Sequence, residues 1–202
     1  MCFDLHVNYY VMRPIFTVHA GEFIVGEFIE QNFRNLNVWI PSKDTGIDFL
    51  VTDQKNTKTV SLQVKLSKDY KNPEALDDFQ HGLDAAGWLT LSHDKIKESQ
   101  ANYWVFVLVS HERKMKPQFI IITPDELLKR LSAIHPDKKS YHFYPWIITT
   151  KQKSKIAIHG RGLSNEKKQL LVEKGWQVGE EDRVLTSFLN NWKELEELNM
   201  MN

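Results

Sequence analysis

Three polar residues interrupt two strand-like segments in the first third of the chain. Asp48 stands within GIDFLVTD (46–53), and Gln63 and Lys65 stand within TVSLQVKL (59–66). Because successive side chains of a strand point to opposite faces, Gln63 and Lys65 share one face and the aliphatic residues the other. A polar turn separates the two segments, which predicts a hairpin. Across that hairpin, Asp48 can share a site with Gln63 and Lys65.

A carboxylate, an amide and a lysine in this arrangement suit a divalent-metal hydrolase. Mg²⁺ prefers hard oxygen ligands, usually one or two carboxylates together with substrate phosphate and waters. Asp48 would be the principal ligand, and the Gln63 side-chain oxygen and the Val64 carbonyl would complete the protein's share. Lys65 would orient or help to deprotonate the attacking water, and would stabilise charge that develops on a phosphate.

A purely structural interpretation of the same residues stays open. An amphipathic hairpin strand commonly shows Gln and Lys side chains to solvent. Asp48 follows Gly46 closely in the sequence and would then be an ordinary turn residue.

The segment 20–36 contributes a further acid. Its apolar residues recur at helical spacing, as Ile24, Val25, Phe28, Ile29, Phe33 and Leu36. Helical geometry places Glu22 on the same side as this core-facing stripe, Glu27 on the solvent side and Glu30 at the boundary. A carboxylate on the inner face is costly unless something binds it. Glu22 is therefore the preferred helix acid, and Glu30 stays open as the alternative.

In this order, the residues resemble the PD-(D/E)xK nuclease superfamily in its D…QxK variant, as found in Mrr-like restriction endonucleases. The resemblance covers roughly residues 20–132. It rests on Gly21-Glu22-Phe23, Gly46-Ile47-Asp48, Gln63-Val64-Lys65 and the later runs 104–109 and 117–124.

The resemblance implies an αβββαβ core and Mg²⁺-dependent (or Mn²⁺-dependent) hydrolysis of phosphodiester bonds in DNA. It implies that Asp48, Gln63 and Lys65 form the active-site set, with Glu22 as the acid on the helix. Gln63 stands where most members of the superfamily have a second acidic ligand. The site therefore carries less negative charge than theirs.

The pattern of the whole chain predicts an α/β protein with one domain. We expect a restriction-endonuclease-like core with a mixed sheet in residues 1–135, and a strand and helix extension of the same domain in residues 136–202. The extension would serve substrate binding or dimerisation. The remaining expected elements are a helix over 74–88, strands over 103–110 and 117–123 and two within 141–159, and helices over 125–131, 164–173 and 183–198.

Charge is balanced in total but unevenly distributed along the chain. The 26 Lys and Arg residues equal the 26 Asp and Glu residues, yet basic residues dominate 113–168 and acidic residues dominate 173–197. Two ordinary solvated faces would explain this, but a basic face would also contact the phosphates of DNA. We expect DNA as the partner. The alternative is a catalytically inactive nuclease-fold module that binds DNA or docks to a subunit, and a homodimer is possible through the helix over 183–198.

Several other classes of protein are excluded. Cys2 is the single cysteine, which rules out a disulfide framework and suits a reducing compartment. The longest apolar runs fall far short of the roughly 18–20 residues that a membrane helix needs. The N-terminus lacks the layout of a signal peptide. We therefore expect a cytoplasmic protein with no membrane segment.

Overall fold

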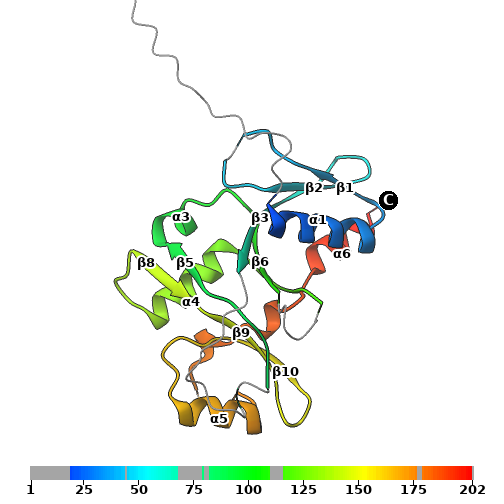
Figure 1. Cartoon of the computed structure of the whole chain (residues 1–202). Helices are drawn as coiled ribbons and strands as arrows, with labels where there is room; N and C mark the ends of the chain where they lie inside the picture. The colour runs from blue at the N-terminus through cyan, green and yellow to red at the C-terminus, as the bar shows by residue number, and fades with distance from the viewer. Residues whose placement is uncertain are drawn as a thin grey trace, which may run out of the picture.

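The computed structural model describes residues 19–43, 45–67, 79, 82–109, 116–176 and 179–201. Its central element is a five-stranded mixed sheet with the strand order β1-β2-β3-β6-β7 (Figure 1). All neighbouring strands are antiparallel except β3 and β6, which run parallel. The strands are β1 (Leu36–Trp39), β2 (Phe49–Asp53), β3 (Thr59–Ser67), β6 (Tyr103–Leu108) and β7 (Gln118–Ile122).

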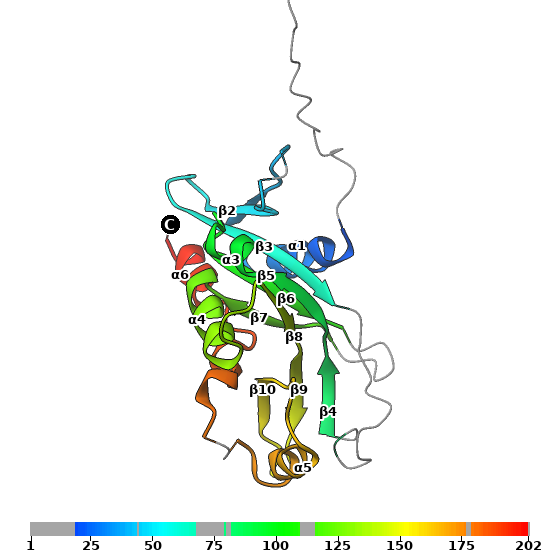
Figure 2. The ribbon, with the colours of Figure 1, turned by 90° about the vertical axis from the view of Figure 1, so that its left-hand side faces the viewer.

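Helices cover both faces of this sheet (Figures 1 and 2). The helices α1 (Ala20–Asn32) and α6 (Lys193–Asn199) pack on one face, over a core that includes Val25, Leu62 and Leu195. The helices α3 (His93–Lys97) and α4 (Pro124–Ile134) pack on the other, over a core that includes Phe106 and Leu127. Because residues of one strand alternate between these two cores, each face of β3 and β6 has its own set of neighbours.

A smaller sheet lies beside the large one, with the strand order β10-β9-β4. It consists of β4 (Leu83–Ala86), β9 (Pro145–Thr149) and β10 (Lys155–His159), and its core includes Leu171 from helix α5 (Asn165–Lys174). A separate ribbon joins β5 (Leu89–Ser92) to β8 (Ser140–Phe143). Strands from before and after residue 135 therefore pair with each other. The division of the chain at residue 135 stays a prediction.

The predicted α/β class with a mixed sheet is confirmed. The hairpin is also present, since β2 and β3 pair antiparallel. The helix predicted over 164–173 is present as α5, and its N-cap is Ser164, whose hydroxyl accepts the Lys167 N–H at 3.3 Å. The helix predicted over 20–36 ends at Asn32 instead, because residues from Leu36 pair with β2. The helix predicted over 74–88 is wrong at its end, where β4 pairs with β9. The earlier part of that prediction lies mainly outside the described residues.

The predicted amphipathic helix over 183–198 is wrong as one continuous helix. The segment forms two short 3₁₀ turns, η1 (Glu181–Arg183) and η2 (Thr186–Phe188), followed by α6. Asn190 breaks the helical path with a φ of 50° and exchanges two hydrogen bonds with Phe119 of β7. Pairing with the edge of the sheet therefore overrides the helical pattern. Trp192 and Leu195 are buried in the chain's own core. The homodimer through this segment stays a prediction.

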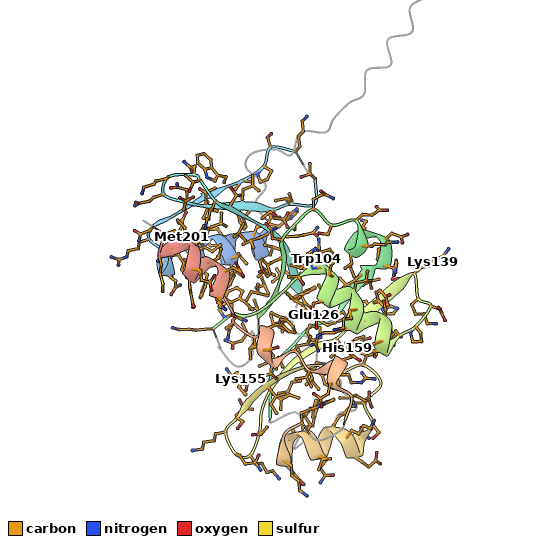
Figure 3. All side chains as sticks on the ribbon, turned by 180° about the vertical axis from the view of Figure 1, so that it is seen from behind. Trp104, Glu126, Lys139, Lys155, His159 and Met201 are labelled. Atoms are coloured by element: carbon orange, nitrogen blue, oxygen red, sulfur yellow. The ribbon has the colours of Figure 1, made fainter. Side chains whose placement is uncertain are left out.

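A pair of histidines, the buried His159 and the half-buried His135, connects the C-terminal end of α4 to the smaller sheet. His159, labelled in Figure 3, is 1% exposed, and its Nδ1 accepts the Tyr144 N–H at 3.1 Å. Its Nε2 lies 3.1 Å from Nε2 of His135. Burial, followed by the charges of His135 and Arg183, lowers the pKa of His159 from 6.5 to about 3. The folded protein therefore holds His159 neutral.

We expect this histidine to make the stability of the protein depend on pH. Between pH 6.5 and 3 this histidine is protonated in the unfolded chain but neutral in the folded protein. The free energy of unfolding is therefore unaffected by His159 above pH 6.5, and it falls as the pH decreases below that value. His159→Asn keeps an acceptor for the Tyr144 N–H but does not titrate. The difference between the free energies of unfolding at neutral pH and at about pH 4 should shrink by roughly 1–3 kcal/mol in this variant. Urea titrations measure it, and the same dependence in both proteins would contradict the assignment.

Candidate active site

Asp48 lies where the hairpin opens. β2 begins at Phe49, which faces Leu62, while β3 continues beyond this pair to Ser67. The Asp48 N–H donates to the Leu62 carbonyl at 2.8 Å, and the Asp48 Oδ2 accepts the Val64 N–H at 2.7 Å. The carboxylate thus takes over as the partner of β3 at the point where backbone pairing stops. Only 7% of Asp48 is exposed, so this carboxylate is a buried group and not a solvated turn residue.

The opening of the hairpin also determines where the Val64 carbonyl points. In an antiparallel ladder, the N–H and C=O of one residue point to the same side of the strand, because paired residues exchange both bonds. Since the Val64 N–H points to Asp48, its carbonyl is directed towards the same open edge. A carboxylate and a backbone carbonyl oxygen are therefore brought to one place by the local geometry of the hairpin.

Gln63 and Lys65 share the opposite face of β3 from Leu62 and Val64, as the alternation predicts. Leu62 and Val64 are buried under α1, whereas Gln63 and Lys65 are partly exposed. The Lys65 Nζ lies over the ring of Trp104, 5.5 Å from the ring centroid. A cation at this distance is attracted by the negative face of an indole ring, which helps to hold the lysine in place.

Glu22 reaches the same place from the first turn of α1. It is 4% exposed and accepts the His19 N–H at 3.3 Å, whereas Glu27 and Glu30 are exposed on the outside of the helix. Between the two acids that the sequence left open, the structure therefore places Glu22 next to β3. One pocket brings the whole predicted set together, and its lining consists of His19, Ala20, Gly21, Glu22, Asp48, Gln63, Val64, Lys65 and Leu66.

Gly21 allows α1 to approach β3 closely enough to deliver Glu22. A Cβ atom built on Gly21 would lie 2.8 Å from the Leu66 Cβ, a distance that requires the helix or the strand to move. A Cβ atom on Gly26, one and a half turns later, would meet only the Phe49 ring, at 3.5 Å. The structure therefore has room for a side chain at Gly26 but not at Gly21.

This difference gives a matched pair of variants. We expect Gly21→Ala to lower the free energy of unfolding by about 1–3 kcal/mol, because overpacking displaces the helix. Gly26→Ala should raise it by about 0.5–1 kcal/mol, because alanine favours the helix and fits the space. Urea denaturation measures both values. Equal effects of the two substitutions would contradict the close approach of α1 to β3.

The residues that line the pocket offer oxygen atoms of the kind that Mg²⁺ prefers. Mg²⁺ is usually held by one or two carboxylates, with waters and substrate phosphates completing its shell. Asp48, the Gln63 side-chain oxygen and the Val64 carbonyl would hold it here, with Glu22 nearby. Among the residues that the structure describes, no cluster of three or more His, Cys, Asp or Glu side chains is arranged to hold a metal ion. A site here would therefore combine few charges with neutral oxygens.

A second groove begins at three of the β3 residues that line the first pocket, and the sequence did not predict it. It shares Gln63, Lys65 and Leu66 with the first pocket and continues across β5 and α3. Its further lining includes Thr45, Gly46, Trp88, Thr90, Ser92, Lys95, Glu98, Ser99, Gln100 and Trp104. The groove exists because β6 pairs with β3 and β5 lies beside them, and these are contacts between segments that are distant in the sequence.

Comparisons of the chain with models of protein families, with curated proteins and with solved structures returned no match. The chemistry of the pocket therefore carries the functional argument. Within the described ranges, none of the helices combines the length and the apolar character required to cross a membrane. The expected cytoplasmic location stays a prediction.

Proposed function

We propose that this protein is a Mg²⁺-dependent endonuclease that hydrolyses phosphodiester bonds in DNA. The observation that carries the proposal is the convergence of Glu22, Asp48, Gln63 and Lys65 on one pocket at the open end of the hairpin. Two of these are buried acids that come from different elements, a helix and a strand end. Both acids line this pocket, and a cation bound there would offset part of the cost of burying their charges.

Each residue of the set has a role that follows from its position. Asp48 and Gln63 would bind the metal ion, together with the Val64 carbonyl, and the ion would polarise the scissile phosphate and acidify a water. Lys65, directed to the pocket from the same face as Gln63, would orient that water and stabilise the charge developing on the phosphate. Glu22 would accept a hydrogen bond from a water in the pocket and so help to position it.

The order of the elements supports the same proposal. The helix α1 precedes three antiparallel strands, and α3 precedes β6, which lies parallel to β3. Two further strands, β4 and β5, come between β3 and α3 in the chain but pair outside the large sheet. The elements of the large sheet alone are therefore compatible with the αβββαβ order that the resemblance to the PD-(D/E)xK superfamily implies. We propose on this basis that the large sheet is a restriction-endonuclease-like core.

The basic region offers fewer free charges for DNA than its composition indicates. Arg130 and Lys129 pair with Glu126, and Lys155 lies 3.8 Å from Asp84. The contacts with phosphate would therefore come from the exposed residues that remain, among them Lys138, Lys139, Lys153 and Arg161.

The test is incubation of the whole protein with supercoiled plasmid, with Mg²⁺ or Mn²⁺ and, as a control, with EDTA. We expect nicked or linear plasmid only in the presence of metal. Salt-dependent binding of DNA without any metal-dependent cleavage would overturn the proposal and favour the alternative, a non-catalytic binding module. Light scattering on the same sample measures whether the protein is a monomer or the homodimer that the sequence leaves open.

A further inference from the structure

Trp88 is a large aromatic residue that the fold holds in an exposed position. It is 49% exposed, although its backbone is fixed: its N–H donates to the Ser67 hydroxyl at 2.7 Å, and that hydroxyl donates to the Trp88 carbonyl at 3.2 Å. Ser67 is the last residue of β3, two positions after Lys65. The backbone of Trp88 is therefore anchored to the same strand that carries the candidate catalytic lysine.

The ring of Trp88 is held from one side. His142 of β8 stacks against it, with an angle of 7° between the ring planes and 6.4 Å between the ring centroids. His142 is itself positioned by the β5–β8 ribbon, in which it faces Thr90. A parallel neighbouring ring restricts the orientations of the indole, which lowers the entropy that this side chain loses when a ligand binds.

The groove between Trp88 and the candidate site is lined mainly by polar groups. Gln63 and Lys65 form its end at the site, and Thr90, Ser92, Lys95 and Gln100 line it further along, together with one acidic residue, Glu98. Hydroxyls, amides and ammonium groups suit a phosphate backbone, and an exposed indole suits the face of a base. An apolar partner helix would find little complementary surface here.

We propose that this groove binds a single-stranded stretch of nucleic acid, with Trp88 stacking on an unpaired base next to the scissile phosphate. The inference rests on the proposed function, because the strand in the groove is the one that passes Lys65. In a duplex the bases stack on each other and present their edges, so a face for Trp88 becomes available only where a base is unpaired or extruded. The preferred substrate would therefore contain a flap, a gap or an unpaired end.

The test measures binding separately from cleavage. The whole protein is titrated, in EDTA, against a short fluorescent DNA single strand and against the same strand in a duplex, and anisotropy gives both dissociation constants. We expect the single strand to bind more tightly. Trp88→Ala should weaken that binding by about tenfold, and Trp88→Phe by no more than about threefold, because stacking is worth about 1–3 kcal/mol per base.

Trp39 provides the matched control. It is 52% exposed on β1 and lies outside the residues that line the groove, so Trp39→Ala should leave the affinity for the single strand unchanged. Equal affinities of Trp88→Ala and wild type, or the absence of single-strand binding by wild type, would overturn the inference. Trp88-dependent binding without plasmid nicking would instead support the inference and count against the proposed activity. Metal-dependent nicking together with unchanged single-strand affinity in Trp88→Ala would support the proposed activity and overturn the inference.

Discussion

Asp48→Asn is expected to reduce Mg²⁺-dependent nicking of plasmid DNA by at least about 10³-fold while the protein stays folded. In the wild-type protein the Asp48 Oδ2 accepts the Val64 N–H at 2.7 Å, and asparagine keeps an oxygen that can accept the same bond. It removes the negative charge that would bind the metal ion, and the charge stabilisation that such an ion supplies is worth several kcal/mol. Initial rates of nicking at saturating Mg²⁺ measure the effect.

Asp48→Ala separates the structural role of this residue from its chemical role. Alanine leaves the buried Val64 N–H without its acceptor, so we expect a loss of about 1–3 kcal/mol of stability that Asp48→Asn does not show. Nicking should be lost in both variants. Retained nicking in Asp48→Asn would contradict the catalytic assignment, and equal stability of the two variants would contradict the hydrogen bond to β3.

Lys65→Met is expected to lower the rate of cleavage by about 10²–10⁴-fold, the range expected for a group that assists proton transfer or stabilises charge. In the wild-type protein the Lys65 Nζ lies 5.5 Å from the centroid of the Trp104 ring. Methionine retains an unbranched apolar side chain at this place, so the packing against Trp104 changes little. The affinity for metal should stay within about threefold of wild type, because a lysine ammonium is not a metal ligand. Nicking kinetics and Mn²⁺ titration measure the two quantities.

Lys97→Ala is the control for a general loss of positive charge. Lys97 is exposed on α3, outside the residues that line the pocket and the groove. We expect this variant to cleave at the wild-type rate within about twofold. Equal losses in Lys97→Ala and Lys65→Met would indicate a diffuse electrostatic effect and would contradict a positioned catalytic lysine.

The parts of the site that depend on local patterns could be predicted from the sequence. A period of two residues places Gln63 and Lys65 on one face of β3, and a period near 3.6 places Glu22 on the inner side of α1. Both placements hold in the structure. A hairpin joins neighbouring segments, so the approach of Asp48 to β3 was also within reach of local reasoning.

The parts that depend on distant segments could not be predicted in this way. Trp104 lies beside Gln63 because β6 pairs with β3 in parallel, across a connection of more than thirty residues. The apolar spacing in 183–198 is helical, yet Asn190 pairs with Phe119 of β7 and divides the segment. The need for a glycine at position 21 likewise follows from the packing of α1 on Leu66, which no periodicity in the sequence reveals.

A crystal of the wild-type protein soaked in Mn²⁺ tests the central claim most directly, because the anomalous signal locates the ion without assumptions about activity. We predict a peak about 2–2.3 Å from an Asp48 carboxylate oxygen, next to the Val64 carbonyl and the Gln63 side chain. The peak should be absent from crystals of Asp48→Asn. No peak at this place in the wild-type protein, or the same peak in the variant, would contradict a metal site at the opening of the hairpin.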